Sequence, residues 1–356
     1  MLQGFLMLFK ILLFCFFSIY LSANHIDRGF LQNDIDVIRS FDIDESYIYN
    51  KSFIEVYNDM MLYNKNKYQE SLNTAMPFLP KIKKLLYENN IPQTFLYLAM
   101  AESYFNTGAK SRKRAKGVWQ FMKSTARRYD LVINQQFDDR MDIVKSTKAA
   151  ILYLGYQKKI FGSWYLAVLG YNCGEGRVYE AMARAILDRY VEKNGSSRTT
   201  KHYAKTIRKY QQKRVGFSTL YKTYKKIKKL GPLPPLEYLL RVQKDQKRQY
   251  FPQESRRYLK KILSLAIMSQ KSFLIDKNNT HLLNIGANDS IKKFELTGDL
   301  NLENIASLAN LSTQKLSTLN KHIRKKIIVS AKKGYNLYIP YENITQKLLD
   351  RLKVIR

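Results

Sequence analysis

The chain has few of the residues that break helices, form crosslinks or bind metals. Its 356 residues include only 15 glycines and 8 prolines, which favours a mainly helical protein with room for two domains. Of its two cysteines, Cys15 lies in an apolar N-terminal segment, so once that segment is removed Cys173 has no disulfide partner. The four histidines are scattered without metal-ligand spacing. We therefore expect no metal or other cofactor, and we expect His202, His281 and His322 at the surface.

Acidic residues are also few. The sequence has 29 Asp and Glu against 61 Lys and Arg, a formal net charge of +32. Such a charge is compatible with nucleic-acid binding, but the basic residues are spread over the whole chain and an exported chain does not meet nucleic acid. We therefore expect an anionic cell wall or membrane surface as partner, and no nucleic acid. A general lysine-rich composition explains the charge equally well, and the oligomeric state stays open.

The N-terminal segment, residues 1–23, predicts export. It is apolar with one interruption at Lys10, and its apolar core over residues 11–21 is short for a membrane span and typical of a secretory signal. The bulky Phe14 before Cys15 disfavours lipidation of that cysteine. We expect a periplasmic protein whose N-terminal segment is either cleaved or kept as a membrane anchor.

A single carboxylate, Glu102, ends an apolar helical run. We expect Pro92 to open this helix and Asn106 and Gly108 to end it, which places Glu102 in the last turn. The negative end of the helix dipole and partial burial both disfavour an ionised carboxylate. The pKa of Glu102 should therefore be raised, leaving a proton available near neutrality. From this residue alone, a solvated glutamate at a helix end is the simpler interpretation.

Separated motifs in a fixed order change that interpretation. They include Glu102-Ser103, Ser111, Gly117-Val118-Trp119-Gln120-Phe121-Met122, the run 170–178 (GYNCGEGRV) and the run 252–258 (PQESRRY). Together they resemble the lytic transglycosylase domain of glycoside hydrolase family 23, most closely its membrane-bound lytic murein transglycosylase D branch. The resemblance covers roughly residues 80–270. It implies a mainly α, lysozyme-like catalytic domain of the goose type.

The resemblance also implies a role for each matching residue. Glu102 would be the sole catalytic acid/base, and the substrate-binding residues would be Ser111, Gln120, Met122, Tyr171, Asn172, Glu254 and Tyr258. The implied reaction cleaves the β-1,4 bond between N-acetylmuramic acid and N-acetylglucosamine in peptidoglycan glycan strands. Glu102 would protonate the glycosidic oxygen and then take a proton from the C6 hydroxyl, which closes a 1,6-anhydro ring. Such an intramolecular attack outcompetes bulk water once the hydroxyl is oriented.

Two other functions stay open at this point. A hydrolysing muramidase would need a second carboxylate to hold a water, and a non-catalytic peptidoglycan-binding scaffold would need none. We interpret Asp130, Asp138, Asp139 and Asp142 as caps and surface partners of basic residues, and Glu175 as a turn residue. No motif position therefore supplies the second carboxylate.

The expected helices follow the apolar pattern. They cover about 92–104, 118–129, 143–160, 164–171, 177–191 and 254–270, with loops at 193–201 and 231–235. Ser124 and Ser163 are expected as caps or first-turn residues. Trp119 and Trp164 fall inside this pattern, so we expect both in the core rather than as sugar platforms.

The chain divides into several parts. After the N-terminal segment we expect a helical region packing on the catalytic domain (24–80), the catalytic domain (81–272), a linker (273–292), a LysM-like domain (293–345) and a tail (346–356). The last domain rests on the run 294–306 and a closing strand over 335–340, which resemble a small α+β LysM module with a second helix over 310–320. This implies an N-acetylglucosamine-binding anchor. A folded appendage that only packs against the catalytic domain is equally consistent.

Overall fold

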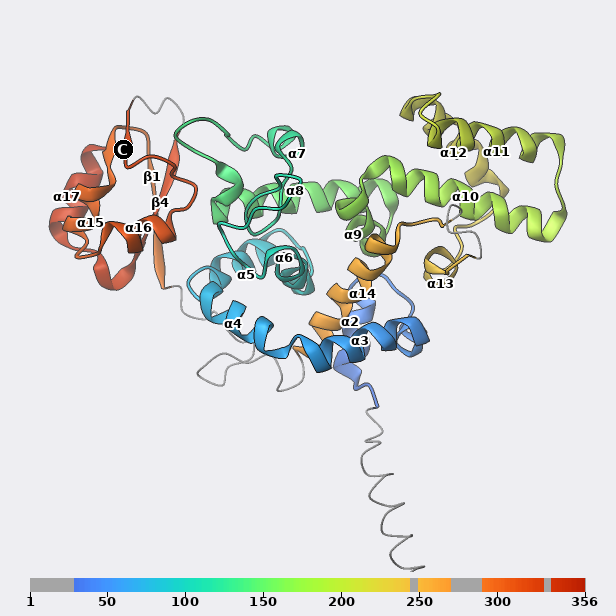
Figure 1. Cartoon of the computed structure of the whole chain (residues 1–356), viewed down its shortest axis with the longest axis horizontal. Helices are drawn as coiled ribbons and strands as arrows, with labels where there is room; N and C mark the ends of the chain where they lie inside the picture. The colour runs from blue at the N-terminus through green and yellow to red at the C-terminus, as the bar shows by residue number, and fades with distance from the viewer. Residues whose placement is uncertain (1–28, 244–248, 270–289, 330–333, 356) are drawn as a thin grey trace, which may run out of the picture.

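The protein consists of a large helical region followed by a small α+β domain (Figure 1). The computed structural model describes residues 29–243, 249–269, 290–329 and 334–355. The expected export segment and His281 lie outside these residues. Within the described part, none of the helices has the length and apolar character needed to cross a membrane.

The first helices share one hydrophobic core with the helices that follow. They are α2 (Gln32–Arg39), α3 (Lys51–Tyr63), α4 (Lys65–Ala75) and α5 (Leu79–Glu88). Both α2 and α3 contact the last helix of the region, α14 (Gln253–Met268). Between α3 and α14, Lys260 Nζ donates to Ser52 Oγ at 2.8 Å. The Phe41 ring, which follows α2, stacks on Phe95 with centroids 5.2 Å apart. The N-terminal helices are therefore part of the scaffold that fixes α14.

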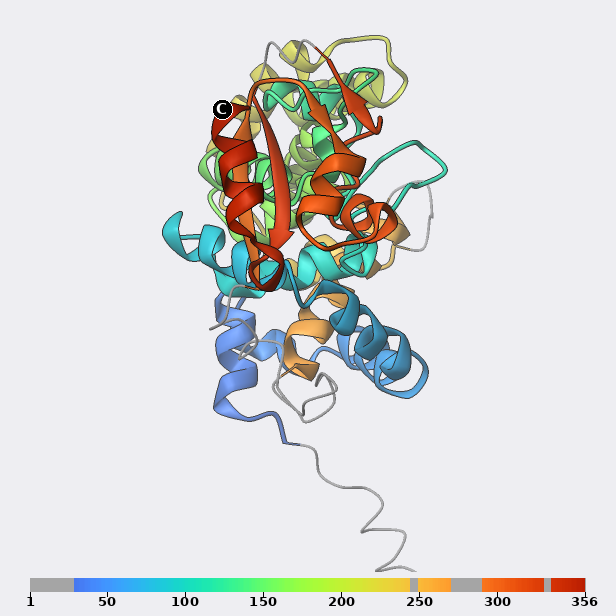
Figure 2. The same cartoon turned by 90° about the vertical axis from the view of Figure 1, so that its left-hand side faces the viewer.

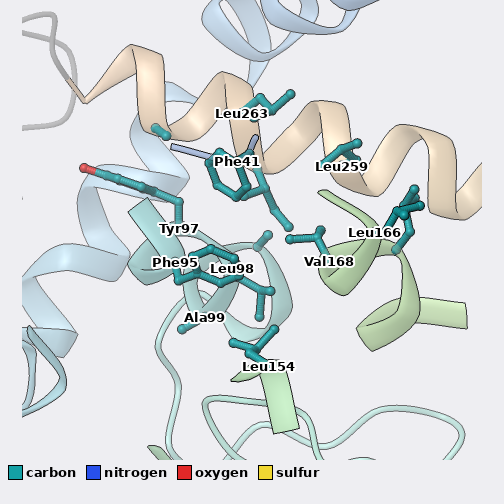
Figure 3. Close-up of a cluster of buried hydrophobic side chains, with 14 of the residues drawn as sticks. Phe41, Phe95, Tyr97, Leu98, Ala99, Leu154, Leu166, Val168, Leu259 and Leu263 are labelled. Atoms are coloured by element: carbon teal, nitrogen blue, oxygen red, sulfur yellow. The ribbon is translucent and has the colours of Figure 1, made fainter. Parts of the chain in front are cut away.

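The centre of the helical region is α6 (Leu96–Ser103), whose residues 96–101 are all buried. Around it lie α8 (Ile143–Phe161), α9 (Trp164–Cys173) and α14. Figure 3 shows Leu98 and Ala99 of α6 between Leu154 of α8, Val168 of α9 and Leu263 of α14. Burial on every side explains why α6 reads as a short, continuous apolar run. It also means that a polar side chain at the end of α6 is held by rigid neighbours.

The remaining helices complete the region, and those after residue 174 extend it away from the small C-terminal domain (Figure 1). They are α7 (Lys123–Arg128), α10 (Glu175–Asn194), α11 (Arg198–Gln211), α12 (Phe217–Ile227) and α13 (Leu236–Leu240). The helix expected at 118–129 begins only at Lys123, and Ser124 is a first-turn residue rather than its cap. Ser163 occupies the N-cap position of α9 without a capping hydrogen bond from its side chain. The expected loop at 193–201 is only three residues long, because α10 runs to Asn194 and α11 begins at Arg198.

Left-handed backbone conformations occur after α6, which ends within one residue of the expected position, and before α7, which begins later than expected. Helix α6 is preceded by a 3-10 turn at Gln93–Phe95 and ends at Tyr104, with φ +53°, before reaching Asn106 and Gly108. The segment before α7 turns at Gly117, with φ +80°, where a Cβ would lie 1.8 Å from the Arg140 carbonyl oxygen. Only glycine permits this approach.

The C-terminal domain pairs β1 (Ile291–Leu296) with β4 (Tyr335–Pro340) in an antiparallel sheet. A second small pair joins β2 (Leu300–Asn301) and β3 (Ile327–Ile328), and the helices are α15 (Leu302–Leu308) and α16 (Thr313–Leu319). Residues 346–354, expected as a tail, form helix α17 (Gln346–Val354), which buries Leu348 and Leu352 in the domain core. Strand β1 also begins two residues inside the expected linker. These differences enlarge the domain but keep its strand–helix–helix–strand order.

Figure 2 shows this domain in front of the helical region. A buried polar network joins the two. Asp142, the N-cap of α8, accepts hydrogen bonds from Tyr338 Oη at 2.7 Å and from Asn336 Nδ2 at 2.8 Å. His322 lies in the same network, with Nε2 2.8 Å from the Asn336 carbonyl oxygen and 3.5 Å from Asp142 Oδ2. The expectation that His322 is a surface group is therefore wrong, because the domain contact covers it. His202 is exposed as expected.

Candidate active site

Glu102 lies where α6 meets the turn that precedes α7. The neighbouring Ser103 Oγ donates to the Val118 carbonyl oxygen at 2.8 Å, and Trp119 Nε1 donates to Thr147 Oγ1 of α8 at 2.8 Å. Trp119 is fully buried, so it is a core residue as expected, although it lies in a turn rather than a helix. These bonds fix the backbone on both sides of the Glu102 side chain.

Helix α14 brings three polar side chains to Glu102. Tyr258 Oη donates to Glu102 Oε1 at 2.5 Å, and Lys261, one turn further on, donates from Nζ to the Ala101 carbonyl oxygen at 2.9 Å. Glu254 lies one turn before Tyr258, and its charge also acts on Glu102. The three residues lie at positions i, i+4 and i+7 of one helix, which places them on one face.

The surroundings of Glu102 favour its protonated form. Burial raises the pKa of Glu102 to about 7. The Tyr258 hydrogen bond and the positive charge of Lys261 partly oppose this rise, and the negative charge of Glu254 adds to it. Near neutral pH the carboxyl group is therefore divided between its protonated and ionised forms, which suits a group that first donates and then accepts a proton.

Tyr171 and Asn172 lie at the end of α9. Tyr171 Oη donates to the Trp119 carbonyl oxygen at 2.6 Å, so this hydroxyl holds the turn that carries Gln120. Asn172 Oδ1 accepts from Ser255 Oγ of α14 at 2.6 Å. Burial raises the pKa of Tyr171 well above its ordinary value, and the charge of Glu102 adds to this rise. The two residues therefore connect α9 to both sides of the Glu102 environment.

The other expected binding residues lie on the segment before α7. Gln120 has φ +47° and donates from Nε2 to the Gly117 carbonyl oxygen at 2.8 Å. Ser111 Oγ accepts from the Ala115 backbone N–H at 2.9 Å. Met122 is 42% exposed and precedes the first turn of α7. The structure thus joins Glu102 directly to Tyr258, whereas the hydrogen bonds of Ser111 and Gln120 stay within their own segment.

Three of the four aspartates that we expected as caps or surface partners of basic residues are buried instead of lying at the surface. Asp138 pairs with Lys116 at 3.1 Å and Arg140 at 2.8 Å. Asp139 pairs with Lys145 at 3.1 Å. Asp142 caps α8 and belongs to the domain contact described above. Asp130 is exposed. Glu175 starts α10 instead of lying in a turn.

Lys261 is the residue near Glu102 that sequence reasoning missed. Burial lowers the pKa of Lys261, while the charges of Tyr104 and Glu102 oppose that change. Lys261 follows Tyr258 by three residues in the predicted helix, and this spacing places both side chains on the same helix face. Among the described residues, no group of three or more His, Cys, Asp or Glu side chains is arranged to hold a metal ion.

Two known families match this chain. Residues 81–186 match the transglycosylase SLT domain, and residues 291–350 match the LysM-like domain of lytic transglycosylase MltD. The first match runs from α5 into α10 and includes Glu102, but it ends before α14, which carries Glu254 and Tyr258. The second match covers both strands of the main C-terminal sheet and the first five residues of α17. The resemblance predicted from the motifs is therefore confirmed, as is the mainly α fold with a small LysM-like domain.

Curated relatives match the catalytic region. Membrane-bound lytic murein transglycosylase D of Escherichia coli (strain K12) is 37% identical over 122 residues, which are 34% of this chain and 27% of that protein. A protein of Alteromonas sp. (strain M-1) named for tributyltin chloride resistance is 36% identical over 110 residues, 31% of this chain and 53% of that protein. The alignments thus span between about a quarter and half of the relatives' lengths. Residues 81–186 are thus similar to the transglycosylase SLT domain, and residues 291–350 are similar to the LysM-like domain of lytic transglycosylase MltD.

Proposed function

We propose that this protein is a peptidoglycan lytic transglycosylase in which Glu102 is the single general acid/base. The observation that carries the proposal is the Glu102–Tyr258 pair. It combines a carboxyl group whose pKa lies at about 7 with a hydroxyl donor 2.5 Å from its Oε1 atom. The relatives' names and the SLT domain match support peptidoglycan glycan strands as the substrate.

The proposed reaction has two proton transfers through one carboxyl group. Glu102 donates its proton to the glycosidic oxygen as the bond between that oxygen and C1 of the muramyl residue breaks. The ionised Glu102 then accepts the proton of the C6 hydroxyl, whose oxygen bonds to C1 and closes the 1,6-anhydro ring. The Tyr258 hydroxyl stabilises the ionised form between these steps and keeps the carboxyl group oriented. Atoms balance without water, because the substrate supplies the attacking oxygen.

Hydrolysis is the second candidate function, and Glu254 is the residue that would support it. Glu254 is exposed, lies on the same helix face as Tyr258 and acts electrostatically on Glu102. A hydrolase would use such a second carboxylate to activate water. Hydrolysis would leave hydrated reducing ends in place of anhydro ends, so the products distinguish the two candidates.

Digestion of purified peptidoglycan, with mass spectrometry of the released fragments, tests the proposal. The wild-type protein should release anhydro-ended muropeptides, and Glu102→Gln should release none while keeping its helical circular dichroism. Glu88→Gln, an exposed glutamate on α5, is the matched control and should retain activity. Unchanged release by Glu102→Gln would refute the assignment. Release of hydrated ends that depends on Glu254 would favour hydrolysis.

We further propose a cell-envelope location in which the LysM-like domain helps to hold the glycan. The relative's name, membrane-bound, and the LysM-like match support this location, and the net charge of +32 suits an anionic wall or membrane surface. Binding to isolated sacculi should weaken as salt is raised. Salt-independent binding would argue against charge as the cause of retention.

A further inference from the structure

A cavity of about 810 Å³ lies beside the residues discussed above. It is open to solvent and is bordered by the end of α9, the first turns of α10, the end of α11 and the turn that joins α11 to α12. Cys173, which lines it, directly follows Asn172, and the Asn172 side chain is bonded to Ser255 of α14. The cavity therefore borders the end of α9, the helix that also carries Tyr171 and Asn172. No step of the proposed reaction uses it.

Positive charge dominates the ionisable groups that line this cavity. Arg177, Lys213 and Arg214 face it together with one carboxylate, Glu180. Lys213 and Arg214 are exposed, and neither forms an ion pair with an acidic side chain of the described residues. Two cations are thus available to an incoming ligand.

The one carboxylate in the cavity wall is already neutralised. Glu180 is 2% exposed and forms ion pairs with Arg177 and with Arg184, the latter at 3.1 Å. It also accepts a hydrogen bond from Gln211 Nε2 at 2.7 Å. Its charge therefore opposes an anionic ligand only weakly.

Two further groups in the cavity wall are compatible with an anion. The buried Nε of Arg177 has no hydrogen-bond partner among the described residues, although Arg177 Nη2 donates to the Gln249 carbonyl oxygen at 3.0 Å. Burial raises the pKa of the Cys173 thiol to about 11, so it is uncharged at neutral pH. The thiol adds no negative charge to the cavity.

We infer that this cavity binds the carboxylates of the peptide substituent that peptidoglycan carries on its muramyl residues. This inference rests on the proposed function and adds a second recognition element to it. The sugar rings themselves are uncharged, so they give no reason for cations beside the reaction site. The carboxylates of a peptide stem reaching past Asn172 would pair with Lys213 and Arg214. The enzyme would then distinguish peptide-bearing glycan strands from bare ones.

The test compares two substrates for each protein variant. Glycan strands with their peptides, and strands stripped of peptides by an amidase, are digested by the full-length protein. The Lys213→Ala/Arg214→Ala double variant should raise KM by about 5- to 10-fold on peptide-bearing strands, the expected loss of two partly exposed ion pairs, with kcat unchanged. On stripped strands it should match the wild-type protein. The control variant Lys201→Ala/Lys205→Ala removes two exposed lysines of α11 outside the cavity. It should leave the KM for both substrates unchanged.

Two results would overturn the inference. Equal KM changes on both substrates would show that Lys213 and Arg214 do not bind the peptide. Inhibition by inorganic phosphate, with none by the free stem peptide, would show that the cavity takes phosphate groups instead. Wild-type cleavage of stripped strands into anhydro products would support the proposed function in either case, whereas failure to cleave either substrate would refute the function itself.

Discussion

The Glu102→Gln variant tests whether the protein disfavours an ionised carboxyl group at this position. Glutamine keeps the size of the side chain and an oxygen that accepts the Tyr258 hydrogen bond, but it does not titrate. Burial raises the pKa of Glu102 from an ordinary 4.5 to about 7. Since one pKa unit corresponds to about 1.36 kcal/mol, the folded state loses about 3 kcal/mol when this group ionises.

The sign of the effect follows from proton binding. Between pH 4.5 and about 7 the folded state holds more of the Glu102 proton than the unfolded chain does. The free energy of unfolding therefore falls as pH rises through this range. The stabilisation is fully present below pH 4.5 and is lost above about pH 7. The Glu102→Gln variant does not lose this free energy of unfolding, because glutamine does not titrate.

Urea unfolding of both proteins at pH 4.5 and pH 8.5 measures the effect. The stability of Glu102→Gln relative to the wild-type protein should increase by about 3 kcal/mol between these pH values. Titration of all other groups is common to both proteins and cancels in the difference. Glu88→Gln should show no such increase, because Glu88 is exposed. A pH-independent difference for Glu102→Gln would refute the raised pKa.

Three further predictions concern the same scaffold. Tyr258→Phe removes a hydrogen bond that lowers the pKa of Glu102. The alkaline limb of the pH–rate profile should therefore move to higher pH, and kcat should fall. An unmoved limb would contradict the pairing of Tyr258 with Glu102. Gly117→Ala places a Cβ against a backbone oxygen at 1.8 Å and should cost at least about 2 kcal/mol in urea unfolding, whereas Gly155→Ala, a helical position with open space, should not destabilise. Tyr338→Phe removes the 2.7 Å hydrogen bond to the α8 cap and should cost about 1–2 kcal/mol; unchanged stability would show that this bond does not hold the domains together.

Local sequence patterns predicted most of the helices and the side chain at the centre of the site. The apolar run before Glu102 marked a buried helix, because burial on every side leaves no polar face to interrupt it. The 254–270 helix carried Tyr258 on the face that returns to Glu102. In both cases the signal is short-range, since helical periodicity fixes which side chains share a face.

The helix ends near Glu102 were harder to predict. Tyr104, Phe105 and Gln120 adopt positive φ values of 53°, 58° and 47°, although none is a glycine or asparagine. Their conformations are imposed by contacts such as the Ser103–Val118 bond rather than by local preference. Residue propensity therefore gives no signal for the left-handed Gln120, before which no helix begins and after which α7 starts at Lys123.

The contact between the two domains could not be read from either part of the sequence alone. Asp142 and His322 are 180 positions apart, and each looks like an ordinary cap or surface group in its own segment. The buried network exists only because the α+β domain packs on the start of α8. The same holds for Lys261, whose relation to Glu102 depends on how α14 crosses α6.

Digestion of peptidoglycan in ¹⁸O-labelled water tests most directly whether Glu102 carries out cleavage without a second carboxylate. The wild-type protein should release anhydro ends that contain no label, and Glu102→Gln should release no fragments. Labelled reducing ends from the wild-type protein would show that water attacks the muramyl carbon, and they would contradict the proposed transfer of the C6 hydroxyl proton to Glu102.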